Sequence, residues 1–158
     1  MTRLIELEDA DFDWLVDERA PAREGLRRPP GGVDRPPTLA TIRRMNQRLV
    51  ASGCNCAWLI VDNDEVVGLC SFKAPPSAGT AEIGYGIAAS RRRRGHATAA
   101  VGAIVDLARA DRTMKALVAE TAISNPDSAR VLENNGFSRV GRRRDTDDGP
   151  VNLWRLVL

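Results

Sequence analysis

A run of four arginines followed by small residues is the part of the sequence best suited to chemistry. Residues 90–100 read SRRRRGHATAA. Gly95 lets the main chain approach a ligand closely, Ala97 keeps the next position small, and Thr98 adds a hydroxyl donor. Where such a loop opens a helix, the free N–H groups and the helix dipole attract an anion, and arginines can bind a further phosphate. The stretch predicts a phosphate-binding loop, although it lacks the glycine patterns of a Walker loop or a dinucleotide fingerprint.

A strand before this loop and a helix after it are needed to position it, and the sequence supplies both. The segment AEIGYGIAA at 81–89 is typical of a strand, and residues 95–110 place Val101, Ile104 and Ala108 on one helical face. A helix that joins the strand at 81–88 to the next strand at 115–123 requires a crossover. We therefore expect these two strands to be parallel neighbours.

The remaining elements follow from periodicity and turn residues. Strands are expected at residues 2–7, 56–62, 65–73, 81–89, 115–123, 137–144 and 151–158, and helices within 8–20, 38–53, 95–110 and 125–136. Proline and glycine make residues 20–37 a long loop on the substrate side. The order predicts a single α+β domain over residues 1–158, with a mainly antiparallel twisted sheet of about seven strands flanked by about four helices.

Two motifs in this order resemble the GNAT superfamily of N-acetyltransferases. Arg92-Arg93-Arg94-Gly95-His96-Ala97 is similar to its R/Q-x-x-G-x-G/A signature, and NPDSARVLENNGF, from Asn125, matches its second motif, N-x-x-S-x-x-V-L-E-x-x-G-F. The resemblance covers essentially the whole chain. It implies a GNAT-like fold and acetyl transfer from acetyl-CoA, a co-substrate, with no metal.

The resemblance also implies where acetyl-CoA binds. Amides of the arginine-glycine loop would hold its pyrophosphate, and main-chain groups of residues 87–89 would pair with the pantetheine arm or donate to the thioester oxygen. Asn125 is either a helix N-cap or a pantetheine contact. His96 is not expected to be catalytic, since its side chain would point away from the thioester. The implied cofactor-binding residues are Ile87, Ala88, Ala89, Arg92, Arg93, Arg94, Gly95, His96, Ala97, Thr98, Asn125 and Ser128.

Three positions depart from the family pattern. Ala89 stands where a proline is frequent, and Arg93 stands where a glycine is frequent, so residue 93 needs a conformation open to a Cβ. Leu132 occupies the position at which many members carry a tyrosine that protonates the leaving thiolate. That tyrosine mechanism is therefore not expected. The version of the motif with Ser128 resembles the branch that acts on protein N-termini, ribosomal proteins included.

Acetyl transfer to an amine requires a neutral amine and a stabilised thiolate leaving group. Glu82 is the candidate base, acting through water, and its alternative role is a salt bridge at the strand edge. Ser128 is the candidate acid, and its alternative role is to satisfy main-chain groups in the first turn of its helix. A water relay without Glu82 is also open.

The acceptor is expected to be a protein N-terminal α-amine attacked directly in a ternary complex. Deprotonating an α-amine with a pKa near ~7.7 costs about 1 kcal/mol at pH 7, whereas a lysine amine near ~10.4 costs about 4.6 kcal/mol. The alternatives are a small-molecule amine, or a catalytically idle acyl-CoA-binding or regulatory module on the same fold.

Composition argues against several other classes of protein. The 23 basic and 21 acidic side chains give a net charge of only +2, and aromatic residues are 4%, so no nucleic-acid partner is expected. No apolar run approaches the ~18 residues that span a bilayer, and the N-terminus is acidic, so we expect a cytoplasmic protein with no membrane partner. A homodimer is an open alternative to a monomer.

The cysteines are expected to be reduced. Cys54, Cys56 and Cys70 are odd in number, and one residue separates the first two in a segment that is typical of strand. His96 is the sole histidine, which argues against a histidine-based metal site or a Ser-His-Asp triad.

Overall fold

A seven-stranded sheet organises the molecule. The computed structural model describes all 158 residues. The strands are β1 (Thr2–Glu6), β2 (Ala57–Asp62), β3 (Glu65–Phe72), β4 (Thr80–Ile87), β5 (Ala116–Ala122), β6 (Ser138–Asp145) and β7 (Gly149–Val157). The helices are α1 (Asp11–Val16), α2 (Pro36–Ala51), α3 (His96–Ala110) and α4 (Pro126–Asn134), with a short 3-10 helix, η1 (Ala89–Arg91). The predicted order of elements is confirmed, and their bounds agree to within a few residues.

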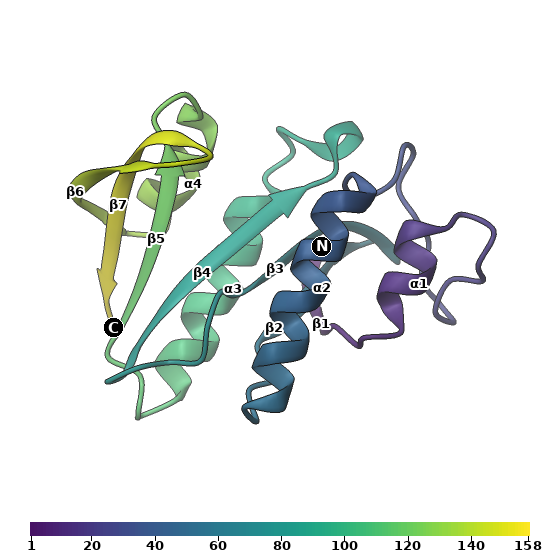
Figure 1. The fold of residues 1–158 in the computed structure, drawn as a ribbon, viewed down its shortest axis with the longest axis horizontal. Coiled ribbons are helices and arrows are strands. Elements are labelled where there is room, and N and C mark those ends of the chain that lie inside the picture. The colour runs from purple at the N-terminus through teal and green to yellow at the C-terminus, as the bar shows by residue number, and fades with distance from the viewer.

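The strand order is β1-β2-β3-β4-β5-β7-β6, and all neighbours are antiparallel except β4 and β5. The predicted crossover through α3 is therefore confirmed. The parallel pairing covers only Thr80–Glu82 against Ala116–Val118. Beyond it the two strands diverge (Figure 1). As a result, the second half of β4 has a partner on one edge only, β3.

Each face of the sheet is covered by different helices. α2 and α3 lie on opposite sides (Figure 1). On β4, Ala81 and Ile83 are buried in the core that includes α3, because alternate residues of a strand point to opposite faces. Glu82 and Gly84 consequently face the side of α2. Leu39 of α2 packs in the second core with α1 and the loop that follows it.

The prediction of three reduced cysteines is wrong. Cys54 and Cys56 form a disulfide, and only Cys70 is free and buried. The segment that holds the pair is not strand, because β2 begins at Ala57. Gly53 ends α2 with a left-handed φ of 84°, and the turn that follows leaves the two Cα atoms 5.5 Å apart, within the range that a disulfide spans.

None of the helices has the length and apolar character needed to cross a membrane.

Candidate active site

The loop between β4 and α3 presents a row of main-chain donors. The N–H groups of residues 92–98 donate no hydrogen bond within the chain, and the first bond of the helix runs from the N–H of Ala99 to the carbonyl of Gly95. Gly95 is the N-cap residue, with a left-handed φ of 83° and no side-chain cap. A helix of 15 residues begins directly after it. These free amides at a helix N-terminus are an arrangement that binds phosphate groups.

Arg93 adopts the left-handed conformation, with a φ of 62°. Glycine reaches this region without steric cost, whereas a side chain makes it unfavourable. The structure thus gives a physical reason why glycine suits this position. The turn that the loop needs is formed by Arg93 and Gly95 together.

The four arginines of the loop differ in what they contact. Arg91 is bound to Glu65, with Nη2 3.1 Å from Oε2, so its guanidinium supports the fold. Arg92 donates from Nε to the carbonyl of Ile87 at 3.2 Å. Arg93 lies 3.8 Å from a carboxylate oxygen of Asp127, and both side chains are exposed. Arg93 and Arg94 are therefore the guanidinium groups most available to a ligand.

Alternation along β4 determines which main-chain groups face the gap between β4 and β5. The N–H of Ala88 donates to Val67 at 2.8 Å, and Glu82 accepts from the N–H of Lys73 at 2.8 Å. Residues 82 and 88 therefore use their main chain for pairing with β3, and residues 83, 85 and 87 turn theirs the other way. Of the predicted pantetheine contacts, Ala88 has its amide bound within the sheet.

Ser128 lies in the first turn of α4, and Asn125 caps that helix. The Oδ1 atom of Asn125 accepts from the N–H of Ser128 at 3.2 Å, so the N-cap interpretation is confirmed. Leu132 is fully buried in the core. The position to which the family resemblance assigned a thiolate-protonating tyrosine is thus part of the hydrophobic packing here.

Tyr85 is a site residue that the sequence analysis missed. Its phenolic oxygen lies 3.0 Å from Ser128 Oγ and donates to the Ser128 carbonyl at 3.0 Å. Burial raises the pKa of the Tyr85 phenol above its usual value. The alternation of β4 was the available signal, since Tyr85 falls on the same face as Ala81 and Ile83.

Glu82 lies on the opposite face of β4 from Tyr85. Its carboxylate is 3.1 Å from the ammonium of Lys73, so the strand-edge salt bridge considered from the sequence is present. The stem of Lys73 covers Gly84 on the same face. A salt-bridged, half-exposed carboxylate remains open to water, and this leaves the base role of Glu82 compatible with its ion pair.

His96 is placed away from this arrangement. It is buried, and its Nδ1 atom lies 2.9 Å from the hydroxyl of Thr2 on β1. The chain has no group of three or more His, Cys, Asp or Glu side chains arranged to hold a metal ion.

A cavity of about 220 Å³ opens on the face of the sheet that carries Glu82. Its wall is mostly apolar, and its only charged side chains are Asp34 and Lys73. Both the long loop and α2 contribute to it, and its floor includes β4 at Gly84, Tyr85 and Gly86. The lining residues are Leu7, Val33, Asp34, Thr38, Ile42, Met45, Leu69, Cys70, Ser71, Lys73, Gly84, Tyr85 and Gly86.

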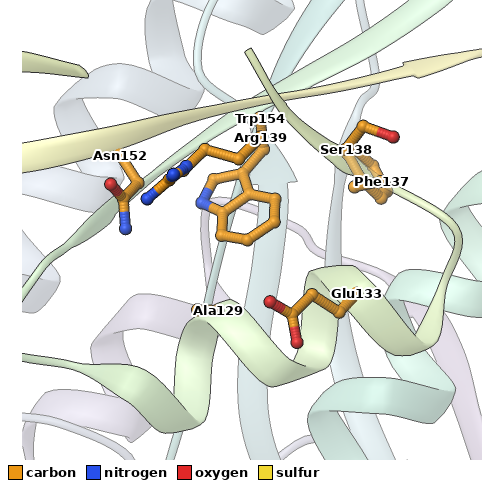
Figure 2. A pocket seen from close by; sticks show the side chains of 7 residues that line it. All are labelled: Ala129, Glu133, Phe137, Ser138, Arg139, Asn152 and Trp154. Carbon is orange, nitrogen blue, oxygen red and sulfur yellow. The ribbon is translucent and has the colours of Figure 1, made fainter. Parts of the chain in front are cut away.

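A larger cavity, of about 500 Å³, lies elsewhere, between α4 and the β6–β7 hairpin. Figure 2 shows Glu133 and Arg139 on its walls, with the ring of Trp154 between them. None of the predicted acetyl-CoA or catalytic residues lines either cavity. Size alone would favour the larger one, but position favours the smaller one, because it is lined by Gly84, Tyr85 and Gly86 in the half of β4 that is not paired with β5.

The chain belongs to the family of acetyltransferase (GNAT) domains, whose model matches residues 2–138. Membership confirms the class that the two sequence motifs predicted, an acetyl-CoA-dependent acetyltransferase domain. An uncharacterized N-acetyltransferase, p20 of Bacillus licheniformis, is 28% identical over 101 residues. That alignment covers 63% of this chain and spans 57% of the length of the relative.

Solved structures confirm the fold. The chain superimposes on AAC(6')-Ib in complex with ribostamycin and coenzyme A with a TM-score of 0.70 at 21% identity, over 99% of this chain and 93% of that one. It also superimposes on RimL, a ribosomal L7/L12 alpha-N-protein acetyltransferase, with a TM-score of 0.66 at 22% identity, over 79% and 72% of the two chains. At these identities the likeness establishes the GNAT-like fold.

Proposed function

We propose that this GNAT N-acetyltransferase transfers the acetyl group of acetyl-CoA to the α-amino group of a peptide chain. The observation that carries the choice of acceptor is the small, mostly apolar cavity beside β4. The relatives alone do not decide between acceptors, because an aminoglycoside complex and a ribosomal-protein acetyltransferase both share the fold.

On the donor side, the free amides of residues 92–98 are proposed to bind the pyrophosphate of acetyl-CoA. Arg93 and Arg94 are positioned to pair with a further phosphate group, since a guanidinium binds phosphate in bidentate geometry. The unpaired edge of β4 after Glu82 leaves the main chain of Tyr85 and the N–H of Ile87 open to the pantetheine arm, while the Ile87 carbonyl accepts from Arg92. The thioester would then lie between the diverging strands.

On the acceptor side, the cavity selects against polycations. Asp34 is its only carboxylate, and Lys73 adds a positive charge at the same wall. A polyamine or aminoglycoside carries several ammonium groups, and burying unpaired charges against aliphatic side chains is costly. A peptide N-terminus has one amine and an apolar first side chain that such a wall accommodates. Its α-amine also costs only about 1 kcal/mol to deprotonate at pH 7.

The two proton transfers of the reaction are proposed to take place on opposite faces of β4. Glu82 does not line the acceptor cavity but lies on the same face of β4, ion-paired to Lys73 of its wall, and is proposed to accept the amine proton through a water molecule. Ser128 lies on the other face and is proposed to donate its hydroxyl proton to the departing thiolate. As the C–N bond forms and the C–S bond breaks, the amine loses a proton on one side of the strand and the sulfur gains one on the other.

An acceptor panel tests the proposed function. Free thiol release from acetyl-CoA would be measured with short peptides bearing different first residues, the same peptides with blocked N-termini and an internal lysine, spermidine and kanamycin. We expect the highest kcat/KM for free N-termini with an apolar first residue. Faster turnover with spermidine or kanamycin would overturn the acceptor assignment, and CoA binding without any turnover would support the idle-module alternative.

Ser128→Ala tests the role of the hydroxyl. Acid assistance in such reactions contributes about 10²–10⁴-fold, and a serine donor is expected at the lower end, so kcat should fall roughly 100-fold with the KM for acetyl-CoA nearly unchanged. Ser52→Ala is the matched control, since it removes a hydroxyl that donates to the Leu49 carbonyl at the far end of α2. Full activity of Ser128→Ala would exclude the role.

A further inference from the structure

A phenol bridges the opening where β4 and β5 diverge. Tyr85 projects from β4 to the first turn of α4, which follows β5, and contacts both oxygen atoms of Ser128 at 3.0 Å. It is the only tyrosine in the chain. Its ring is half-buried beside the core formed with α3. The phenol therefore lies next to the hydroxyl that is proposed to face the leaving thiolate.

The hydrogen atoms of this contact allow two arrangements. In the first arrangement, Tyr85 donates its hydrogen bond to the Ser128 carbonyl oxygen, which can only accept. The Ser128 hydroxyl must then donate to the Tyr85 oxygen. In the second arrangement, Tyr85 donates its hydrogen bond to Ser128 Oγ, and the Ser128 hydroxyl is free to donate to another acceptor. The two arrangements differ only by rotation of two O–H bonds, and in the second Ser128 is both supported by a donor and free to donate.

The second arrangement matters because the serine hydroxyl, the thiol and the phenol differ in acidity. A serine hydroxyl is a far weaker acid than a thiol, so Ser128 can pass its proton to a thiolate only if its own oxygen receives another proton at the same time. A phenol with a pKa near ~10 is a weaker acid than a thiol with a pKa near ~8.5. Proton transfer from the phenol to a thiolate is therefore unfavourable by about 30-fold in the equilibrium constant. Burial raises the pKa of Tyr85 further and keeps the phenol protonated at neutral pH. Tyr85 is nevertheless the one side chain that hydrogen-bonds to Ser128 Oγ, and it carries a proton that it can supply.

We propose that Tyr85 is a positioning residue that acts through Ser128 and resupplies its proton as the thiolate departs. As the C–S bond breaks, the Ser128 proton moves to sulfur and the Tyr85 proton moves to Ser128 Oγ. The phenolate then takes a proton from water, and the hydroxide left behind is neutralised by the proton that the acceptor amine releases to solvent, which restores the pair. The inference rests on the proposed role of Ser128 and does not depend on which amine is the acceptor.

A double-mutant cycle on the full-length protein tests the inference. The single-turnover rate constant of acetyl transfer would be measured at saturating acetyl-CoA and acceptor for the wild type, Tyr85→Phe, Ser128→Ala and the double variant. Tyr85→Phe keeps the ring and removes only the hydroxyl. We expect it to lower the rate constant about tenfold or more, to leave both KM values within about twofold, and to have no further effect in the Ser128→Ala background.

The outcomes separate this inference from the proposed function. A slow Ser128→Ala with a fully active Tyr85→Phe would overturn the role of Tyr85 and leave that of Ser128 standing. A fully active Ser128→Ala would overturn both. Multiplicative losses in the double variant, or a Tyr85→Phe loss that appears in KM or together with a lowered Tm, would show a structural role and overturn the inference. Ser52→Ala is expected to match the wild-type rate constant throughout.

Discussion

Arg93 shows how one residue type can conflict with the backbone that the site needs. Its φ of 62° falls in the left-handed region. That conformation costs a residue with a side chain about 1 kcal/mol or more, and it persists because the loop must turn its amides outward. The side chain is otherwise nearly uncommitted, since its one ion pair, to Asp127, is exposed.

We therefore expect Arg93→Gly to stabilise the protein without ligand. Relief of the left-handed conformation is partly offset by the greater freedom of glycine in the unfolded chain, so the net gain in the free energy of unfolding should be about 0.5 kcal/mol. Arg94→Gly is the matched control, because it removes a neighbouring arginine whose φ is not positive. Urea denaturation measures both. Equal effects of the two changes would mean that the backbone of Arg93 is not strained.

Single residues were also where prediction from the sequence reached its limit. The capping residues predicted α4 correctly, with Asn125 at its N-cap and Gly136 just past its end, because capping is a local property. Tyr85 was missed, since its contact with Ser128 joins residues 43 positions apart. The Cys54–Cys56 disulfide was missed for a related reason: the segment was expected to be extended, and the turn after Gly53 brings the two residues together.

The close pairing of β3 and β4 supports the loop that is proposed to bind phosphate. Gly68 on β3 lies directly against the end of β4, and a Cβ there would overlap the carbonyl oxygen of Gly86 and come within 2.9 Å of Ile87 Cδ1. Gly86 itself has nothing within 4 Å of its own Cβ position. The two glycines on neighbouring strands thus differ in what they tolerate.

Gly68→Ala is expected to destabilise the protein by about 2 kcal/mol, as overpacking of a tight contact does, and to weaken acetyl-CoA binding because β4 shifts. Gly86→Ala should leave the free energy of unfolding nearly unchanged and raise the KM for the acceptor, since Gly86 lines the cavity. Thermal unfolding and steady-state kinetics of both variants provide the test. Similar losses of stability would contradict the packing described for β3 and β4.

Most of the arrangement of strands and helices could be predicted from the sequence. Hydrophobic periodicity identified each element, and the crossover rule identified β4 and β5 as parallel neighbours. The divergence of these strands after Glu82 could not be predicted, because it depends on how two strands are packed by different helices. The long loop was expected on the substrate side, and Val33 and Asp34 do line the cavity, but no local pattern indicates its shape.

The number of reactive cysteine thiols tests the structure of the molecule as a whole. Cys54 and Cys56 are paired, and burial raises the pKa of the Cys70 thiol. We expect no thiol to react with an aromatic disulfide reagent at pH 8 in the native state, one to react after denaturation without reductant, and three after reduction. Three reactive thiols in the denatured, unreduced protein would restore the original prediction of reduced cysteines.

The proposed mechanism depends on the opening where β4 and β5 diverge. The N-terminus of α3 supplies free amides, the unpaired half of β4 supplies an edge, and the two faces of that strand separate the acceptor cavity from the Ser128 hydroxyl. In this proposal each part depends on the others, because the thioester would reach the opening between β4 and β5 only when its carrier is held at the loop.

A crystal structure of the complex with acetyl-CoA tests this arrangement most directly. The account predicts pyrophosphate oxygens about 3 Å from several N–H groups of residues 92–98, with the thioester between β4 and β5. Acetyl-CoA bound in the larger cavity between α4 and the β6–β7 hairpin, with the amides of residues 92–98 facing only solvent, would contradict it.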